Sequence, residues 1–504
     1  MAQVPSLNRP WRLVLPQGMY DELRAHLFPG DGDEHGAVIA AGIAESPRGV
    51  RLLARSLHLA VDGIDYVAGK RGYRMLRADF IAGRIAACRD ERLVYLAIHN
   101  HGGSNRVGFS GDDLRSHERG YPALLDIASG MPVGALVFAP DAIAGDIWLP
   151  GESRIALAGA TIVGASLHHL APEPASPAAR AAPGYDRQAR LFGDAGQALL
   201  LQSKVGIIGL GGAGSLLAEY LGRLGVGELV LVDPERAEPT NLPRLTAATR
   251  LDAMLPWAGI AGPGWLRKAA GRFAQPKVSM ARRNILRANP EAKVTAIFDN
   301  FLEANVAAQF LDCDYLFLAA DTMRARLLFN AIVHQYLIPG VQVGAKVQVN
   351  PESGEVLDVF SVIRPVTPGS GCLLCNKLIN SAKLQQESIS AEDRERQRYV
   401  DEPGVVAPSV ITLNATAVSL AANDFLFYVT GLRDAAAPMA YMRLQPQHRR
   451  VWLDEPRRSE SCPECGPSSA SRLARGDSRR LPAIESLTSR SRLSWWRRLA
   501  GETT

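Results

Sequence analysis

The chain has 504 residues, 47% of them hydrophobic and 21% charged, which is an ordinary globular composition and enough for roughly three average domains. The formal net charge is +5, and residues 466–504 account for all of it with eight arginines against three acidic residues. The rest of the chain is close to neutral, which argues against a broad nucleic-acid-binding surface. The longest candidate membrane span, 133–149, is interrupted by Pro140, Asp141 and Asp146, so we expect no transmembrane segment. The first residues lack the smooth apolar run of a secretory signal, and we expect a cytoplasmic protein.

The first strongly predicted element is a buried strand at 93–98 (LVYLAI), which leads directly into the motif HNHGGSNRVGFSGDD. His99 and His101 stand two residues apart at the end of this strand, so both imidazoles can face one ion. Asp113 adds a carboxylate. Two histidines and one carboxylate leave the fourth position of a tetrahedral zinc open, which is typical of a catalytic site.

A catalytic zinc site also needs a base that takes a proton from the bound water and passes it to the leaving amine. Glu34, in DEHGAVIAAG, is the candidate. A purely structural interpretation stays open, because Ser110 and Asp113 also fit the S-x-x-D capping box of a helix start, which requires no metal.

These residues resemble the JAMM (JAB/MPN) family of zinc isopeptidases, whose pattern is an upstream Glu, then H-x-H, a short gap and S-x-x-D, over about residues 10–165. The resemblance implies an α/β domain with a mixed sheet. It also implies that the Zn²⁺ ligands are His99, His101 and Asp113, that the general base is Glu34, and that the tetrahedral oxyanion is supported by Ser110. One departure is Gly102, where the family often has Pro, and it puts the rigidity of the loop in doubt.

Residues 170–184 (LAPEPASPAARAAPG) separate two segments of different character, and their Pro, Ala and Ser content predicts an extended linker. The predicted division of the chain is an N-terminal domain at 1–169, this linker at 170–184, a C-terminal domain at 185–466 with an insertion at about 250–270, and a basic tail at 467–504. We expect the tail to be largely disordered because it is rich in Ser and Arg.

In the C-terminal domain, the pattern predicts a buried strand at 204–209, a helix at 212–224 and a second strand at 228–233. This βαβ unit indicates an α/β fold with a Rossmann-like, doubly wound, mainly parallel sheet. The turn inside it lets backbone N–H groups approach phosphate oxygens at the helix start, through Gly209, Gly211, Gly212 and Gly214. The turn alone, with Asp233 ending the next strand where a ribose-binding acid belongs, also fits an NAD-dependent dehydrogenase.

The surrounding motifs favour ATP over NAD. They are YDRQARLFG at 185–193, DPERAEPTNLPR at 233–244, QPK ending in Lys277, and LAADTMRAR containing Asp321. A pyrophosphate already tied between two nucleosides needs no additional cations. An enzyme that splits ATP must neutralise the charge that builds on the phosphoryl groups, and Arg, Lys and Mg²⁺ serve this purpose.

Together these motifs resemble the ThiF/MoeB/ubiquitin-activating superfamily, over about residues 183–466. The resemblance implies an ATP site made by the glycine turn with Asp233 at the ribose, Arg244 and Lys277 at the phosphates, Asp321 at Mg²⁺, and Asn241. It further implies that Arg187 reaches the ATP site of a neighbouring subunit, and therefore a homodimer. The family's structural Zn²⁺ would bind Cys372, Cys375, Cys462 and Cys465, whose two C-x-x-C pairs also indicate tetrahedral zinc in a cytoplasmic chain.

The expected acyl-transfer cysteine is missing. Family members that form a thioester keep a cysteine shortly before G-V-x-A-P, and here YVDEPGVVAP has Val400. Cys88 lies in the N-terminal domain and Cys313 begins a predicted buried strand. We therefore expect an acyl adenylate that is handed directly to a partner's nucleophile, or to a hydroxyl such as that of Ser409 or Thr412.

The two resemblances together imply a bifunctional enzyme of a bacterial ubiquitin-like conjugation pathway, with antiviral defence as an expected setting. The protease would trim or deconjugate a ubiquitin-like protein, the second half would adenylate its C-terminal carboxylate, and a separate conjugating enzyme would be a partner. One alternative is sulfur-carrier activation in thiamin, molybdopterin or cysteine synthesis. Two others are a binding scaffold with one inactive half and an NAD oxidoreductase.

Overall fold

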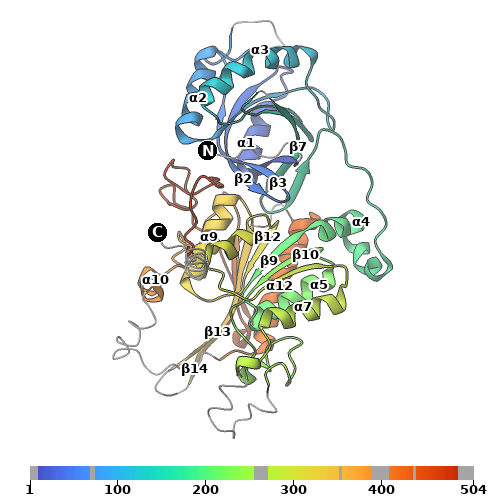
Figure 1. The fold of residues 1–504 in the computed structure, drawn as a ribbon, viewed down its shortest axis with the longest axis vertical. Helices are drawn as coiled ribbons and strands as arrows, with labels where there is room; N and C mark the ends of the chain where they lie inside the picture. Colours follow the sequence, from blue (N-terminus) through green and yellow to red (C-terminus); the bar gives the residue numbers. More distant parts are fainter. Residues whose placement is uncertain are drawn as a thin grey trace, which may run out of the picture.

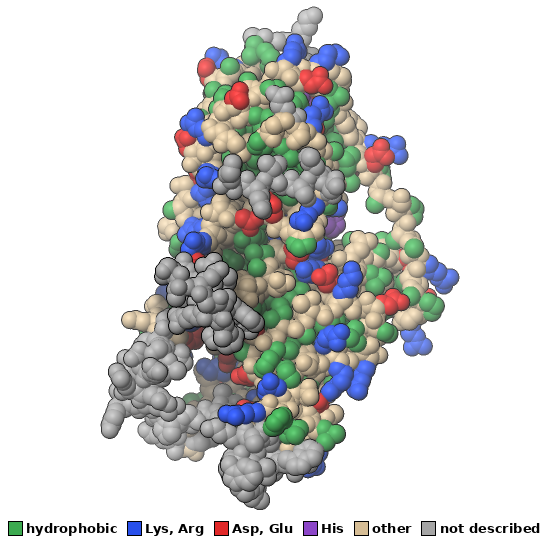
Figure 2. Space-filling view, viewed as in Figure 1, with side chains coloured by type: hydrophobic (Ala, Val, Ile, Leu, Met, Phe, Trp, Pro, Cys, Tyr) green, Lys and Arg blue, Asp and Glu red, His purple; other side chains and the backbone are tan. Residues whose placement is uncertain are grey.

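A computed structural model describes residues 9–67, 74–151, 153–254, 271–350, 353, 355–388, 408–434, 437 and 439–485. These residues form two α/β halves, each built on an eight-stranded mixed sheet (Figure 1). No helix among them combines the length and the apolar character needed to cross a bilayer. On the face that Figure 2 shows, acidic and basic side chains are interspersed over both halves.

The N-terminal half is a curled sheet with the strand order β1-β3-β2-β4-β5-β6-β7-β8, and β1 also pairs with β7. Helix α1 packs inside the curl, whereas α2 and α3 cover the outer face of β4 and β5. The bounds are β1 (Trp11–Pro16), α1 (Gln17–Leu27), β2 (Gly36–Ser46), β3 (Gly49–Leu59), α2 (Ala78–Glu91), β4 (Val94–Asn100), α3 (Gly111–Ala128), β5 (Val133–Ala139), β6 (Ala142–Trp148), β7 (Arg154–Val163) and β8 (Leu167–Leu170). Residues 171–182 then contain neither helix nor strand and are mostly exposed.

The C-terminal half has the strand order β11-β10-β9-β12-β13-β14-β15-β16, parallel from β11 to β13 and antiparallel from β13 onward. Helices α5, α7 and α12 cover one face of this sheet and α9 covers the other. The bounds are α4 (Asp186–Gln202), β9 (Lys204–Ile208), α5 (Gly212–Leu224), β10 (Glu228–Val232), α7 (Lys277–Ala288), β11 (Lys293–Ile297), α8 (Ala304–Ala307), β12 (Tyr315–Leu318), α9 (Met323–Tyr336), β13 (Gly340–Val349), β14 (Val356–Val366), α10 (Ser381–Ser388), α12 (Ile411–Thr430), β15 (Tyr441–Gln445) and β16 (Arg450–Asp454).

The elements predicted around both motifs are confirmed. The strand predicted at 93–98 is β4, and the βαβ unit predicted at 204–233 is β9, α5 and β10. Strands β9, β10 and β12 are apolar runs buried on both faces, as expected for parallel strands between two helix layers. Most of the predicted insertion (255–270) and the segment 389–407, which contains Val400, lie outside the described residues.

The expectation of a disordered tail is wrong for residues 467–485, which are ordered and packed against the rest of the protein. Residues 486–504 lie outside the described part of the chain. We call residues 466–485 the C-terminal strap. Leu473 is 5% exposed and Ala474 is fully buried, and both belong to the core that lies under α9. The backbone N–H groups of Ala474 and Gly476 donate to the carbonyls of His334 (2.8 Å) and Gln335 (3.0 Å). The Ser- and Arg-rich composition predicted disorder because composition contains no information about these buried contacts with distant segments.

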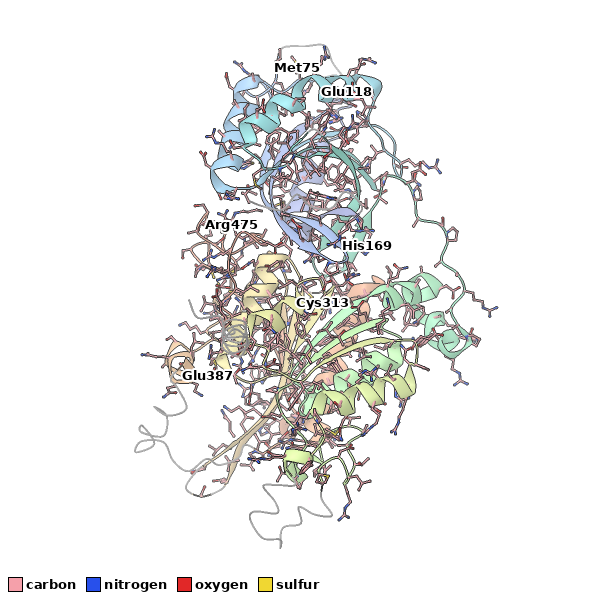
Figure 3. All side chains as sticks on the ribbon, viewed as in Figure 1. Met75, Glu118, His169, Cys313, Glu387 and Arg475 are labelled. Atoms are coloured by element: carbon pink, nitrogen blue, oxygen red, sulfur yellow. The ribbon has the colours of Figure 1, made fainter. Side chains whose placement is uncertain are left out.

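The strap also contacts the N-terminal half. Gly476 forms an isolated parallel bridge with Ile43 of β2, and the N–H of Asp477 donates to the Ile43 carbonyl (2.8 Å). Arg55, 7% exposed, donates to backbone carbonyls of the strap, including that of Leu473. Arg475, labelled at this junction in Figure 3, pairs with Glu91 at the end of α2 (2.7 Å). The strap therefore contacts both halves and connects α9 with β2 and the end of α2.

Candidate functional site

The glycine-rich turn after β9 forms the centre of one candidate site. Gly209 has a φ of +88°, a backbone conformation that residues with a side chain rarely adopt. A Cβ there would also lie only 2.9 Å from the backbone N of Ala320, so both the conformation and the available space favour glycine. A Cβ on Gly214 would overlap the carbonyl oxygen of Gly209. The turn therefore runs closely into the start of α5, where unpaired N–H groups and the helix dipole favour an anion.

Asp233 follows β10 and is fixed beside this turn. Its buried carboxylate accepts hydrogen bonds from the backbone N–H groups of Leu210 (2.7 Å) and Glu235 (2.8 Å). Burial raises the pKa of this carboxyl group, while the Leu210 N–H and the charge of Lys277 oppose the increase. Because Leu210 belongs to the turn, the Asp233 carboxylate and the backbone of the glycine turn form one rigid unit.

Two predicted cations lie at the same edge of the sheet. Lys277, at the start of α7, is 6% exposed and forms an ion pair with Glu235. Arg244 follows the buried Asn241 and donates its backbone N–H to the Asn241 carbonyl (2.9 Å). The Cδ of Arg244 lies 3.5 Å from the position that a Cβ on Gly212 would take, so this side chain passes next to the turn.

Asp321 lies near the turn, whereas Arg187 does not join it. Asp321 is exposed after β12 and follows Ala320, the residue that contacts Gly209. Strands β9, β10 and β12 are adjacent and parallel, so their carboxyl ends share this edge. Arg187 is exposed near the start of α4, and within one chain no contact of the described residues connects it to this edge.

The structure adds two residues that the sequence did not single out. Asn414 of α12 is 5% exposed, and a Cβ on Gly212 would overlap its side-chain amide nitrogen. The same amide donates to the Ser409 hydroxyl (3.2 Å). Glu235 is the second, as the ion-pair partner of Lys277. Asn414 has no local sequence signal, because α12 lies far from the turn in the sequence. Glu235 stands in the DPERAEPTNLPR motif, but its pairing with Lys277 joins segments that are distant in the chain.

The four predicted cysteine ligands come together. The Sγ atoms of Cys372 and Cys462 are 3.7 Å apart and those of Cys375 and Cys465 are 3.6 Å apart, and all four lie within 4.8 Å of one another. Sulfur ligands of one tetrahedral zinc stand roughly 3.8 Å apart, from a Zn–S bond of about 2.3 Å. The donor set and its spacing fit a structural zinc ion.

His99, His101 and Asp113 gather at the end of β4. The two Nε2 atoms are 3.1 Å apart, and carboxylate oxygens of Asp113 lie 3.6 Å from His99 Nε2 and 3.3 Å from His101 Nε2. Ligands of one tetrahedral zinc with bonds of about 2.0–2.1 Å stand roughly 3.3 Å apart. His101 Nδ1 contacts the Gly108 carbonyl (3.1 Å), which leaves Nε2 to face the cluster. The three groups fit a single metal ion.

The capping box considered for Ser110 and Asp113 is also present, at the start of α3. Ser110 Oγ accepts from the Asp113 N–H (3.1 Å), and the Ser110 N–H donates to Asp113 Oδ2 (2.7 Å). Burial alone would raise the pKa of Asp113, but hydrogen bonds with His99 and Ser110 outweigh it and hold this pKa below its ordinary value. The cap thus holds one oxygen of the carboxylate while the other, Oδ1, faces His99.

Glu34 precedes β2 and lies beside these side chains, with its Oε1 3.9 Å from His101 Nε2. Burial raises the pKa of the Glu34 carboxyl group, although His99 and His101 oppose the increase. A carboxylate with increased proton affinity therefore stands next to the candidate metal ligands.

Comparison with known proteins concerns the C-terminal half. The sequence model of the ThiF family matches residues 185–465, so residues 1–184 lie outside the match. The chain is 30% identical over 179 residues to the tRNA threonylcarbamoyladenosine dehydratase of Escherichia coli strain K12, over 35% of this chain and only 59% of that protein. It is 31% identical over 286 residues to the molybdopterin-synthase adenylyltransferase of the same organism, over 56% of this chain and 95% of that protein. The sulfur carrier protein ThiS adenylyltransferase of that organism is 26% identical over 279 residues, covering 55% of this chain and 90% of that protein. Through residues 185–465, the chain belongs to the ThiF family.

Proposed function

We propose that the domain at 185–466 binds ATP and adenylates the C-terminal carboxylate of a small ubiquitin-like protein, releasing pyrophosphate. The observation that carries this proposal is the convergence of Asp233, Arg244 and Lys277 on one glycine turn. An acid for the ribose and two cations for the phosphates at one helix start suit a nucleoside triphosphate, whose charge increases at the leaving pyrophosphate. Asp321, exposed at the same edge, is the residue proposed to hold Mg²⁺.

The proposed roles of the chain's own groups follow from this arrangement. The turn and the first N–H groups of α5 hold phosphate oxygens, and Asp233 orients the ribose. Lys277 forms an ion pair with Glu235, which holds its ammonium group at this edge, and the phosphates of ATP would offer it a second anionic partner. Arg187, exposed on α4, is proposed to complete the site of a second subunit, which makes the active form a homodimer.

The acyl adenylate is proposed to pass directly to a nucleophile of a conjugating partner. All six cysteines lie in the described part of the chain, and four of them form the cluster described above. Burial raises the pKa of Cys88 to about 12 and also raises the pKa of Cys313, so neither supplies a thiolate near neutral pH. Ser409, next to Asn414 and the turn, is the hydroxyl whose position best suits an internal acceptor.

The alternative of sulfur-carrier activation is supported by the relatives named molybdopterin-synthase adenylyltransferase and ThiS adenylyltransferase. Both proposals use the same adenylation and differ only in the carrier. ATP–pyrophosphate exchange with purified candidate carriers separates them, because exchange requires the cognate C-terminus.

For the N-terminal domain we propose zinc-dependent hydrolysis of the JAMM type, acting on the precursor or the conjugates of the same ubiquitin-like protein. The cluster of His99, His101 and Asp113 supports this, together with Glu34 beside it. A zinc ion held there would acidify a bound water and polarise the scissile carbonyl. Glu34 would take the proton and pass it to the leaving amine, and its raised pKa suits that exchange. The setting is proposed to be a cytoplasmic bacterial conjugation pathway with a role in antiviral defence.

Nucleotide binding tests the first half directly. Calorimetric titration with ATP and Mg²⁺ should show binding by the wild type, and NAD should not compete. Lys277→Ala should weaken ATP binding at least tenfold, since a buried charge contact to phosphate is worth about 1.5–3 kcal/mol. Lys293→Ala, an exposed lysine at the start of β11, is the matched control and should leave affinity within twofold. Equal affinity of all three proteins for ATP would contradict the proposed site.

Metal content and cleavage test the second half. The wild type should contain two zinc ions per chain. Glu34→Gln should keep both ions and lose the cleavage of a ubiquitin-like protein that carries a C-terminal fluorescent-protein extension, because the base is removed and the ligands are not. Asp113→Asn should lose one ion. Full cleavage by Glu34→Gln would exclude the proposed base.

A further inference from the structure

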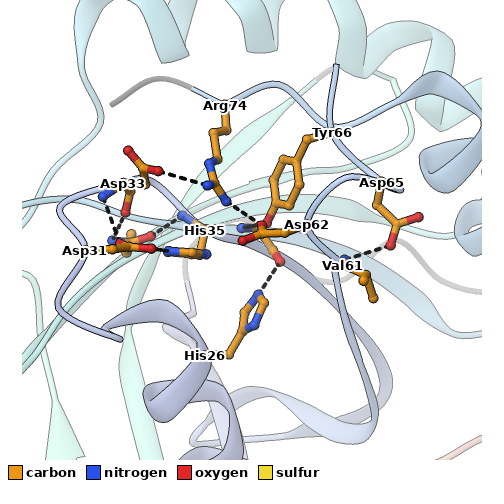
Figure 4. Close-up of polar contacts among 11 residues, drawn as sticks. His26, Asp31, Asp33, His35, Val61, Asp62, Asp65, Tyr66 and Arg74 are labelled. Carbon is orange, nitrogen blue, oxygen red and sulfur yellow. Dashed lines mark hydrogen bonds and ion pairs between the residues drawn. The ribbon is translucent and has the colours of Figure 1, made fainter. Parts of the chain in front are cut away.

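The segment 31–36, which contains Glu34, is held by contacts at almost every residue (Figure 4). The His35 ring is 5% exposed, and its Nε2 lies 3.1 and 3.0 Å from the two carboxylate oxygens of Asp31. The carboxylate of Asp33 pairs with Arg74 (2.8 Å), and the Gly36 N–H donates to the Tyr66 hydroxyl (2.7 Å). The loop before β2 is therefore built as a rigid piece although it has no regular secondary structure.

One of these contacts connects the segment to the histidine strand. Asn100 is the last residue of β4 and follows His99 directly, so its side chain points to the strand face opposite to that of His99. It is 8% exposed, and its Oδ1 accepts the His35 N–H at 2.6 Å. Its Nδ2 donates to the Asp33 carbonyl at 3.4 Å. A single side-chain amide thus holds the peptide groups on both sides of Glu34.

This contact needs an amide. Aspartate would keep an acceptor for the His35 N–H but would place a carboxylate oxygen against the Asp33 carbonyl, and alanine would leave both backbone groups without this partner. Asn100 is adjacent in the chain to both His99 and His101, and the His101 N–H continues the pairing toward β5 by donating to the Phe138 carbonyl (2.9 Å). Asn100 can therefore move little relative to the two imidazoles. The distance from Glu34 to His101 is therefore set through Asn100 as well as through the pairing of Gly36 with His99 in the sheet.

We propose that Asn100 is a positioning residue that fixes the Glu34 carboxylate relative to His99 and His101. The proposal rests on the hydrolase function proposed above. The side chain of Asn100 is not among the candidate metal ligands, and the pairing of β4 in the sheet uses only its backbone. Asn100 acts through the peptide groups on both sides of Glu34, with its side chain on the strand face opposite to that of His99.

The test uses the full zinc-loaded chain and begins with structure and exchange. In crystals of Asn100→Ala, His99, His101 and Asp113 should still hold zinc while the Glu34 carboxylate is displaced or has several positions. Hydrogen exchange of the 31–36 amides should be at least tenfold faster, and zinc affinity measured against a chromophoric chelator should stay within twofold. Asn289→Ala, which removes another buried asparagine (5% exposed) at the end of α7, is the control for general destabilisation and should leave this exchange unchanged.

Catalysis supplies the second readout, with the fluorescent-protein fusion as probe. Asn100→Ala should lower kcat at least tenfold with KM within twofold, and Asn100→Asp should recover part of kcat because it keeps the His35 contact. In a Glu34→Gln background, Asn100→Ala should add less than a twofold effect. An undisplaced Glu34 with unchanged exchange would overturn the proposal. A wild type that binds no zinc at His99 and His101, or does not cleave the fusion, would instead refute the hydrolase function, and the position of Glu34 would still decide the role of Asn100.

Discussion

Gly42 of β2 lies directly against the backbone of the C-terminal strap. Adding a single methyl group there should weaken the contact between the strap and the N-terminal half. A Cβ on Gly42 would overlap the carbonyl oxygen of Ala474, and the next-nearest atom is the backbone carbon of Arg475, 3.1 Å away. Both are backbone atoms, so no change of rotamer relieves the overlap. Gly42→Ala therefore has to move the strap or the strand.

The expected cost can be estimated from the contacts that would be disturbed. Overpacking of this kind costs about 1–3 kcal/mol. Displacement of the strap also weakens two hydrogen bonds, from the Asp477 N–H to the Ile43 carbonyl (2.8 Å) and from the Glu45 N–H to Asp477 Oδ2 (2.7 Å), worth about 0.5–1.5 kcal/mol each. The total of about 2–6 kcal/mol corresponds to an increase in strap opening of roughly 30-fold or more.

Hydrogen exchange followed by mass spectrometry measures this opening. In Gly42→Ala, the amides of Gly476 and Asp477 should exchange at least 30-fold faster than in the wild type, while the β9–α5 turn keeps its protection. Gly83→Ala is the matched control, because Gly83 lies in α2 with no atom within 4 Å of the added methyl, and the change should be neutral or slightly stabilising. Unchanged exchange of the strap in Gly42→Ala would refute the reasoning that the strap is tightly docked on β2.

Two further predictions concern the metal and pH. Cys372→Ser should remove one zinc equivalent per chain and make the strap more sensitive to limited proteolysis, because Cys465 lies immediately before it; retention of both zinc ions would contradict the four-cysteine site. Burial lowers the pKa of His334 to about 3, whereas a histidine in the unfolded chain has a pKa near 6.5. Between these two values the unfolded state binds a proton that the folded state does not, so the free energy of unfolding should fall by about 2 kcal/mol from pH 7.5 to pH 5. Urea denaturation at the two pH values measures the loss, and His334→Gln should abolish most of it; an identical pH dependence in both proteins would show that His334 is not the source.

Those parts of the two candidate sites that depend on local patterns come together in the structure as the sequence predicts. His99 and His101 need only a strand period of two to face the same way. The glycine turn follows from a strand and a helix that adjoin in the chain. The parallel part of the sheet in the C-terminal half could be inferred from the βαβ unit, whereas the antiparallel strands β14, β15 and β16 that make it a mixed sheet were not predicted.

The remaining contacts could not be predicted because they depend on strand order and packing between distant segments. The bond from the His35 N–H to Asn100 exists because β2 and β4 are neighbours in the sheet although they are not consecutive in the chain. The strap was predicted to be disordered from its Ser and Arg content. It is ordered because Leu473 enters a shared core and because Arg472 forms internal pairs with Glu464 and Gln335 in place of contacts with solvent.

The course of the chain has a consequence for how this protein can be dissected. The N-terminal half is connected to the rest at two places, first by residues 171–182 and again by the strap, so the polypeptide returns to it after completing the second half. Cutting the gene at the linker would leave Val14, Ala44 and Leu53, which lie in the core common to both halves, uncovered in an excised fragment. Among the described residues, the same double attachment holds the histidine cluster of the N-terminal half and the glycine turn of the C-terminal half at a fixed separation.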